Sequence, residues 1–349
     1  MNKEYDYIIV GQGFAGTSLA NELLKLNKRV LVFDAPQLPS STMVSGGLFN
    51  PITGRKMVLT WLASELFPFL HKFYKDLEER LGGKYLYNIP LYRPFLNTEE
   101  LNDWQGKWSD ARYSEFIEKV YSEPILPEFF KNNMGGIMLK HAGYLDNQSL
   151  FIDFRNFLRE KEIFVEEEFL TENINYESDS IVYNEYSAKK VILCTGPAGF
   201  GNKLLNDIRF QPLKGEALRL KIEYNTNIMI NRNGFVLPRD GMYVAGATYN
   251  RHSTTWEPSE EGKQEVMAKI DKLLNTGYEI IDQIAGLRPT THDRRPVVGF
   301  LPDQPQIGVF NGLGSKGSTL APFFANQFAN HMVNGSDIYR EVRIERYFK

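Results

Sequence analysis

Three glycines and one acid near the start of the chain have the spacing of a dinucleotide site. Gly11, Gly13 and Gly16 form a GxGxxG motif. Gly11 permits a tight turn, Gly13 lets a pyrophosphate approach the backbone, and Gly16 lets a helix pack closely on a strand. Asp34 follows about 20 residues after the motif, where its carboxylate can accept hydrogen bonds from a ribose 2′-OH.

The elements around this motif are those that must position it. Residues 7–10 are apolar and β-branched, as in a buried parallel strand. Residues 14–26 carry apolar side chains at helical spacing, and residues 29–33 predict a second strand. The helix should begin at the glycine turn, where free N–H groups and the positive helix end favour phosphates. We predict an adenine dinucleotide at this turn, with Phe14 and Ala15 among its contacts.

Two further segments are candidate cofactor contacts. A Gly-, Pro- and Ser-rich stretch follows Asp34 directly, where a loop should pass over the cofactor. Residues 191–194 predict another buried strand that ends in a small-residue turn. The contacts expected from these segments are Ser41, Thr42, Ser45, Gly46, Gly47, Thr195 and Gly196.

A second GxGxxG occurs near the other end of the chain, from Gly312 to Gly317. Too few residues follow it for a helix, a second strand and an acid, so we do not expect a second nucleotide there. It instead predicts a helix end that favours negative charge at a redox centre, such as a reduced flavin. No other segment resembles a nicotinamide site, so oxygen or another carrier is the expected electron acceptor. The cofactor contacts expected here are Gly312, Gly314, Ser315, Lys316, Gly317 and Ser318.

The composition is that of an ordinary globular protein. The chain has 349 residues, 42% of them hydrophobic and 24% charged, and its formal net charge of −3 gives no polycation signal for nucleic acid. No apolar run is long enough to suggest a membrane span. The single cysteine, Cys194, fits a reducing compartment, so we expect a soluble cytoplasmic protein. No clustered metal ligands are apparent, and no metal is expected.

The remaining patterns predict alternating helices and strands at both ends of the chain, with a β-rich stretch at residues 210–248. Helices are expected over residues 57–81, 149–159, 262–276 and 318–333. We expect a discontinuous cofactor domain of residues 1–80, 145–200 and 285–349. Residues 81–144 and 201–284 should form the substrate domain.

Four segments together resemble the D-amino-acid oxidase and glycine oxidase family of FAD-dependent amine oxidoreductases. They are YIIVGQGFAG with Asp34, VILCTGP, GLRPTTHDRRPVVG and NGLGSKGSTLAP. Within that family, NGFVLP, AGATYNRHS and the GLGSKG run are most similar to the oxidase half of a bifunctional enzyme that modifies a tRNA wobble uridine. That enzyme also has a methyltransferase half, which we do not expect in this chain.

The resemblance implies an α/β fold, with a Rossmann-like FAD-binding domain of the glutathione-reductase type and an inserted α+β substrate domain. It also implies oxidation of the C–N bond of an amino acid or N-substituted glycine, by hydride transfer to flavin. The buried position expected for Cys194 favours non-covalent FAD. Two alternatives stay open. One is a tRNA-acting oxidase that removes a carboxymethyl group from a modified uridine, and the other is a non-catalytic flavin-binding protein.

The resemblance also assigns candidate catalytic residues. Arg288 matches the family's substrate-carboxylate arginine, whose planar guanidinium suits a bidentate carboxylate; a salt bridge to Asp293 is the alternative. Phe235 stands where the family often has a tyrosine, and Tyr249 is the candidate replacement for its hydroxyl. Lys316 is a candidate cation beside the flavin. The residues suggested for an anion entrance are Arg55, Lys56, Arg294 and Arg295.

Overall fold

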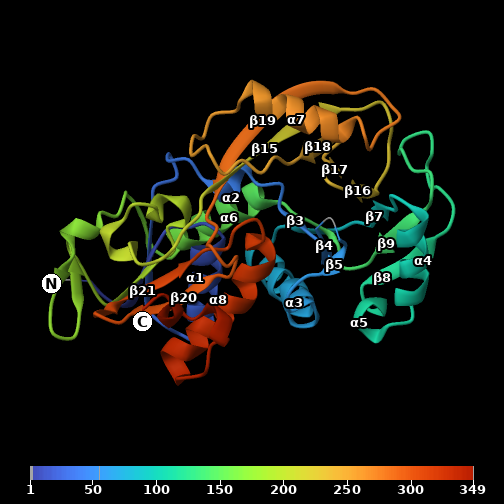
Figure 1. Ribbon diagram of the computed structural model, residues 1–349. Coiled ribbons are helices and arrows are strands. Elements are labelled where there is room, and N and C mark those ends of the chain that lie inside the picture. Colours follow the sequence, from blue (N-terminus) through green and yellow to red (C-terminus); the bar gives the residue numbers. More distant parts are fainter. Residues whose placement is uncertain (1–2, 55, 349) are drawn as a thin grey trace.

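The computed structural model describes residues 3–54 and 56–348, and its first large element is a mostly parallel β-sheet (Figure 1). Strand β1 lies between β2 and β14, and β21 runs parallel to β14. The strands are β11 (Phe164–Glu166), β2 (Val30–Asp34), β1 (Lys3–Val10), β14 (Tyr186–Leu193), β13 (Ile181–Tyr183) and β12 (Asn175–Tyr176), with β21 (Gln304–Asn311) and β20 (Val297–Leu301) beside β14.

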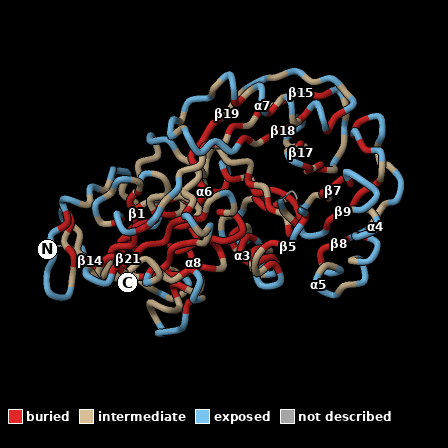
Figure 2. Tube along the Cα trace, viewed as in Figure 1, coloured by how far each residue is buried: buried red, intermediate tan, exposed pale blue. Residues whose placement is uncertain are grey.

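Both faces of this sheet are covered, which explains the continuous apolar runs in its strands (Figure 2). Tyr7 and Ile9 face a helical layer, whereas Ile8 and Val10 pack into a separate cluster on the other face. The helical layer consists of α1 (Phe14–Lys25), α3 (Ala63–Leu81), α6 (Asn147–Glu160) and α8 (Gly317–Asn334). Helices α1 and α8 pack side by side, so the two glycine motifs enter the same layer.

The second large sheet is mostly antiparallel and arches over the other half of the molecule (Figure 1). Its strands are β19 (Glu279–Arg288), β15 (Leu213–Lys221), β18 (Met242–Gly246), β17 (Phe235–Arg239), β16 (Met229–Asn231), β7 (Leu91–Pro94), β9 (Gly136–Leu139) and β8 (Ile117–Tyr121). Helix α7 (Glu260–Ile270) packs against one face through Val266 and Ile270. We propose that the two sheets mark the two domains expected from the sequence.

Smaller elements join the two sheets. A three-stranded sheet consists of β3 (Leu48–Phe49), β10 (Gly143–Leu145) and β6 (Leu86–Asn88), and a hairpin consists of β4 (Ile52–Thr53) and β5 (Val58–Leu59). The remaining α-helices of the described chain are α2 (Ser41–Val44), α4 (Thr98–Lys107) and α5 (Ala111–Ser114). Within the described ranges, no helix combines the length and apolarity needed to cross a membrane.

Two helix predictions were wrong in their bounds. The helix expected over residues 57–81 begins at Ala63, because Met57 turns into the β4–β5 hairpin and Leu62 adopts a left-handed backbone with φ of 54°. The helix expected over residues 262–276 is α7, which starts two residues earlier and ends at Ile270. The predictions for residues 149–159 and 318–333 are confirmed as α6 and α8.

Candidate functional site

A cavity of about 1400 Å³ lies between the first sheet and the second. This volume exceeds the roughly 300–1,000 Å³ of ordinary ligand pockets, so it has room for a large cofactor together with a substrate. Of the suggested anion entrance, Arg294 and Arg295 line this cavity, Lys56 does not, and Arg55 lies outside the described residues. Of the other sequence-predicted site residues, Gly16 alone does not line it. The others do: Gly11, Gly13, Phe14, Ala15, Asp34, Ser41, Thr42, Ser45, Gly46, Gly47, Thr195, Gly196, Tyr249, Arg288, Gly312, Gly314, Ser315, Lys316, Gly317 and Ser318.

The N-terminal glycine turn has the backbone that its sequence predicts. Gly11 has a φ of +100°, and a Cβ there would lie 2.6 Å from the carbonyl oxygen of Cys194. A Cβ at Gly16 would lie 1.8 Å from the carbonyl oxygen of Gly11. Gly16 is therefore a packing residue rather than a cofactor contact. No side chain caps α1 at Gly13, and apart from the weak bond from Phe14 to Thr42 Oγ1, the first N–H groups of the helix stay available at the cavity.

Asp34 lies at the end of β2 and accepts hydrogen bonds from the backbone N–H of Gln12, at 2.9 Å, and from Arg155, at 3.3 Å. Burial raises the pKa of Asp34, although these two partners oppose the shift. Gln12 and Arg155 were missed from the sequence. Gln12 is a variable position of the glycine motif, and Arg155 lies on a distant helix, so neither had a local signal.

The loop after Asp34 is held by its own hydroxyl groups. Ser41 donates to the carbonyl oxygen of Leu287. Ser45 Oγ donates to the carbonyl of Thr42 and accepts from Asn147 Nδ2 at 2.6 Å. Thr42 Oγ1 accepts weakly from the backbone N–H of Phe14, at 3.4 Å, so it is the hydroxyl closest to the glycine turn. Gly46 and Gly47 complete this loop wall.

Thr195 and Gly196 follow β14 and contain a buried group that fits a ligand. The hydroxyl of Thr195 is buried with no hydrogen-bond partner in the described chain. A buried hydroxyl that lines a cavity and lacks a partner is expected to pair with a bound molecule. Beside it, the carbonyl of Gly196 accepts from Asn311. Burial raises the pKa of Cys194, which keeps its thiol protonated and unreactive.

The C-terminal glycine turn opens onto the same cavity. Gly312 and Gly314 have φ angles of +77° and +56°. A Cβ at Gly317 would lie 2.6 Å from the ring of Phe14, so the two glycine turns contact each other. No strand follows α8 in the described residues.

Lys316 lies at the start of α8, with its Nζ 3.3 Å from Thr60 Oγ1. Burial, with a smaller contribution from the charge of Arg295, lowers the pKa of Lys316 to about 8. Among the described residues, no carboxylate lies within 4 Å of its ammonium group. Lys316 is thus a poorly compensated cation on the cavity wall.

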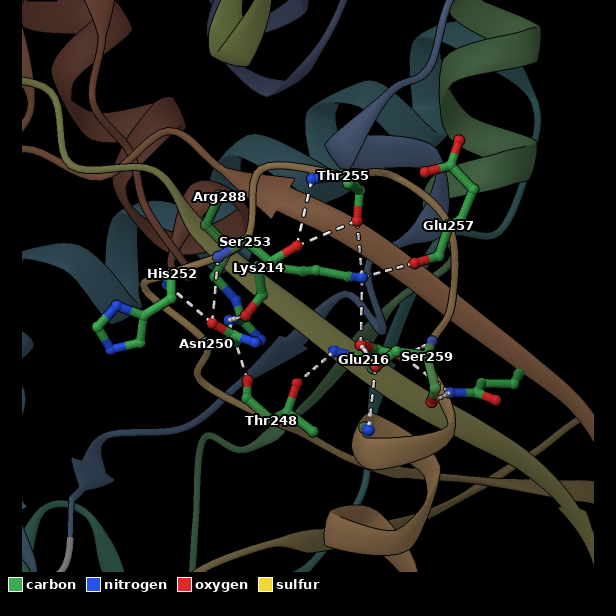
Figure 3. A network of polar contacts seen from close by, with 12 residues as sticks. Lys214, Glu216, Thr248, Asn250, His252, Ser253, Thr255, Glu257, Ser259 and Arg288 are labelled. Atoms are coloured by element: carbon green, nitrogen blue, oxygen red, sulfur yellow. Dashed lines mark hydrogen bonds and ion pairs between the residues drawn. The ribbon is translucent and has the colours of Figure 1, made fainter.

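Arg288 ends β19, and the surrounding backbone fixes its guanidinium group (Figure 3). Nη1 donates to the carbonyls of Thr248, at 3.2 Å, and Lys214, at 3.4 Å. A Cβ at Gly215 would lie 2.0 Å from Nη2, so the guanidinium occupies the space of an absent side chain. Gly215 was also missed, although a glycine inside a strand often marks such a close approach.

The ring of Tyr249 lies 4.7 Å from the Arg288 guanidinium, in cation–π contact. Tyr249 is 62% exposed, and its hydroxyl has no hydrogen-bond partner among the described residues. The alternative salt bridge between Arg288 and Asp293 is not formed, because Asp293 pairs with Arg346 at 2.8 Å. In the described chain, the Nε and Nη2 atoms of Arg288 are without hydrogen-bond partners, so one edge of the fork is free.

The strand under Arg288 is anchored by a buried ion pair (Figure 3). Lys214 Nζ lies 3.4 Å from Glu216, and the two side chains are only 3% and 2% exposed. Burial alone would raise the pKa of Glu216, but hydrogen bonds from Ser259 and the charge of Lys214 lower it. Thr248 is tied to Glu216 through both backbone and hydroxyl. This network holds the two carbonyls that orient Arg288.

One register row of the second sheet forms the wall of the cavity next to Arg288. Each residue in this row is paired with or bonded to the next across neighbouring strands: Ile284, Ala217, Gly246, Phe235, Asn231 and Arg93. All six line the cavity. Ala217 has a small side chain and Gly246 has none, whereas the ring of Phe235 belongs to the cavity wall. Phe235 therefore faces the cavity without the hydroxyl that a tyrosine would supply.

The comparisons with known proteins agree with this geometry. The family model for FAD dependent oxidoreductases matches residues 6–331. Glycine oxidase of Bacillus licheniformis is 26% identical over 98% of this chain and 96% of its own length. The tRNA 5-methylaminomethyl-2-thiouridine biosynthesis bifunctional protein of Marinobacter nauticus is 24% identical over 93% of this chain, which spans only 55% of that relative.

Solved structures support the same fold. Glycine oxidase from Geobacillus kaustophilus superposes with a TM-score of 0.80 at 18% identity, and each chain is covered completely. Iminodiacetate oxidase from Chelativorans sp. BNC1 superposes with a TM-score of 0.78 at 19% identity over 98% of both chains. The Rossmann-like fold expected from the sequence is confirmed. The chain belongs to the family of FAD-dependent oxidoreductases, and FAD is its cofactor.

Proposed function

We propose that this protein oxidises the C–N bond of an amino acid or an N-substituted glycine, and that Arg288 binds the substrate carboxylate. The observation that carries this proposal is the free edge of Arg288 at the cavity. Two parallel N–H donors of a guanidinium match the two oxygens of a carboxylate. Glycine oxidase and iminodiacetate oxidase, whose names state carboxylate-bearing amine substrates, support the assignment.

The protein's own residues bind and orient the substrate. Gly215 leaves room for the guanidinium, and the carbonyls of Lys214 and Thr248 prevent it from rotating. Tyr249 covers its face toward solvent. A carboxylate held in this way fixes the adjacent carbon, which lowers the entropic cost of reaching the reactive geometry. A bound FAD would supply the hydride acceptor for that carbon.

The cofactor contacts expected from the sequence belong to the same proposal. The free N–H groups of α1 would hold the pyrophosphate, and Asp34 the ribose. The unpaired hydroxyl of Thr195 is a further donor or acceptor for the cofactor. We also propose non-covalent binding, oxygen or another carrier as electron acceptor, and a cytoplasmic location.

Anaerobic flavin bleaching tests the proposal. The purified holoprotein should lose its absorbance near the flavin maximum when mixed with an amino acid or N-alkyl glycine from a panel. Arg288→Ala should raise KM for a carboxylate substrate by about 100-fold or more while retaining flavin, because a charged hydrogen-bond pair is lost. Arg340→Ala, which changes an exposed arginine that does not line the cavity, is the matched control. An unchanged KM in Arg288→Ala would remove the assigned role.

The tRNA-acting alternative has one specific observation in its favour, the similarity to the bifunctional relative across 93% of this chain. The net charge of −3 disfavours it, because phosphate neutralisation needs clustered cations. A tRNA complex that weakens steeply with salt, together with flavin reduction by tRNA carrying the modified uridine, would establish this second function.

A further inference from the structure

Three cations surround the β4–β5 hairpin at one end of the cavity. Arg93 donates to the carbonyls of Ile52, at 2.9 Å, and Gly54, at 2.8 Å. Lys316 contacts Thr60, directly after the hairpin, and the guanidinium of Arg295 lies 4.0 Å from the ring of Trp61. All of these residues except Ile52 line the cavity. The hairpin thus brings together positive charges from three distant parts of the sequence.

None of the three cations is neutralised by a neighbouring acid in the described chain. The acidic residues that line the cavity are Asp34, which pairs with Arg155, Glu216, which pairs with Lys214, and the exposed Glu168. Glu100 is the acid whose charge acts on Arg93, but its carboxylate forms an ion pair with Arg232 instead. Arg93 is 2% exposed, and its Nε has no hydrogen-bond partner.

Uncompensated cations at a half-buried wall are costly, and a bound anion relieves that cost. The fixed charge of FAD is its pyrophosphate, for which the N-terminal glycine turn already offers the free N–H groups of α1. The carboxylate beside the amine is assigned to Arg288. Lys316 could also face the negative charge of a reduced flavin, but Arg295 and Arg93 leave positive charge at the hairpin for a further anionic group.

Arg295 lies close to Arg288 along one short loop. Thr291 Oγ1 donates to the carbonyl of Arg295 at 2.7 Å, so the loop turns back on itself. The three residues from Arg288 to Thr291 span at most about 10 Å. The side chains of both arginines reach the same cavity, so a small molecule with two anionic groups is within reach of both.

We propose that the substrate carries a second anionic group, which Arg295 and Lys316 bind at the hairpin end of the cavity. The substrate class is then an amine with two carboxylates, such as an N-carboxymethyl glycine or an acidic amino acid. This inference rests on the proposed function for the carboxylate at Arg288. Arg93 contributes a third positive charge behind the hairpin.

The test compares iminodiacetate with its neutral isostere N-(carbamoylmethyl)glycine, in wild type and in Arg295→Gln. Wild type should prefer the dicarboxylate by about tenfold or more in kcat/KM, because its second carboxylate meets uncompensated charge. Arg295→Gln should lose this preference, so that its kcat/KM for the dicarboxylate falls to the level of its kcat/KM for the amide. Arg340→Gln should behave as wild type. Equal turnover of the two substrates by wild type, or an unaltered preference in Arg295→Gln, would overturn the inference.

A binding measurement separates this inference from the proposed function. Glutarate has the shape of iminodiacetate but no amine to oxidise, and glutaramate replaces one carboxylate with an amide. Calorimetry on the holoprotein should show tighter binding of glutarate in wild type, and no such difference in Arg295→Gln. If that result appears while no amine bleaches the flavin, the anion site stands and the proposed oxidation fails. If amines are oxidised but glutarate binds no better than glutaramate, the inference fails alone.

Discussion

The two glycine turns share the same spacing but are stabilised in different ways. In the N-terminal turn, the third glycine packs against the first, since a Cβ at Gly16 would meet the carbonyl of Gly11. In the C-terminal turn, the third glycine, Gly317, packs against Phe14 of the other turn. The first turn is therefore closed by its own backbone, whereas the second depends on the first.

The charges beside the two turns also differ. The N-terminal turn is followed by α1 and then by Asp34. The carboxylate of Asp34 already forms an ion pair with Arg155. The C-terminal turn carries Lys316 and lies beside Arg295, and neither has an acidic partner in the described chain. The glycine spacing thus specifies a helix end at the cavity, and the neighbouring side chains specify which ligand it takes.

The largest expected effect distinguishes the two turns directly. Gly16→Ala should prevent the protein from accumulating as a flavoprotein, because its methyl group would overlap a backbone carbonyl, with a cost of roughly 4 kcal/mol or more. Gly317→Ala should cost about 1–2 kcal/mol, because the ring of Phe14 can shift. Urea unfolding and flavin absorbance per protein measure both. Equal losses in the two variants would contradict the difference between the turns.

The next effect concerns the substrate side of the cavity, which the C-terminal turn supports. Gly215→Ala should displace the Arg288 guanidinium and lower kcat/KM for a carboxylate substrate by about 100-fold, since misplacement of about 1 Å is this costly. Flavin content should not change. Gly277→Ala, where a Cβ meets nothing within 4 Å, is the control. A loss of flavin in Gly215→Ala would show that the substrate side of the cavity cannot be altered without affecting the cofactor side.

A smaller effect is expected at the acid beside the N-terminal turn. Asp34→Asn should weaken FAD binding by about tenfold and leave KM for the amine unchanged, because one charged hydrogen bond is lost on the cofactor side only. Equilibrium dialysis of the reconstituted apoprotein measures the dissociation constant. Glu168→Gln removes a charge from the same wall without a hydrogen bond and should have no effect. If KM for the amine changes as well in Asp34→Asn, the cofactor side and the substrate side of the cavity are not independent.

The smallest effect is a pH dependence at the C-terminal turn. The pKa of Lys316 is lowered to about 8 from 10.5, so its ammonium is charged below pH 8 and neutral above it. KM for iminodiacetate should therefore rise a few-fold (about 2–5) as pH passes 8, relative to its amide, as charge pairing is lost. Lys316→Arg keeps its charge and should show a flat ratio. A pH-dependent ratio in that variant would assign the titration to another group.

The same shift has a defined sign for stability. Between pH 8 and 10.5 the unfolded chain binds the Lys316 proton while the folded protein does not. The free energy of unfolding therefore rises with pH across this window, relative to Lys316→Met. Urea unfolding of wild type and Lys316→Met at pH 8 and at pH 10.5 checks whether the free energy of unfolding rises as stated.

The parts of the fold that sequence predicts well are local. Strand β1, the glycine turn and helix α1 are contiguous, so their apolar spacing and glycines determine them without distant contacts. The β4–β5 hairpin was missed for the opposite reason. The apolar spacing of the hairpin residues continues into α3, so the whole segment has the pattern of one long helix. The hairpin is also held by Arg93, which lies on a strand more than thirty residues away in sequence.

The candidate site also contains residues that motifs predict and residues that only distant contacts bring together. Arg288 and the cofactor-lining glycines carry motifs, and they line one cavity. Gly215 and the row from Ile284 to Arg93 depend on strand register across distant segments, which no single sequence reveals. Arg155 acts through an ion pair that forms only when α6 docks beside β2.

The position of β14 has a consequence for how the protein is made. This strand pairs with β1 on one side and with β21 on the other, so the central sheet joins segments that are far apart in the sequence. While the ribosome is still synthesising residues 285–320, the nascent chain lacks Arg288, Lys316 and the helix α8 that covers α1. N-terminal regions usually fold first during synthesis. The cavity is therefore complete only after β21 and α8 have packed onto β14 and α1, and a bound cofactor would contact both of these distant segments.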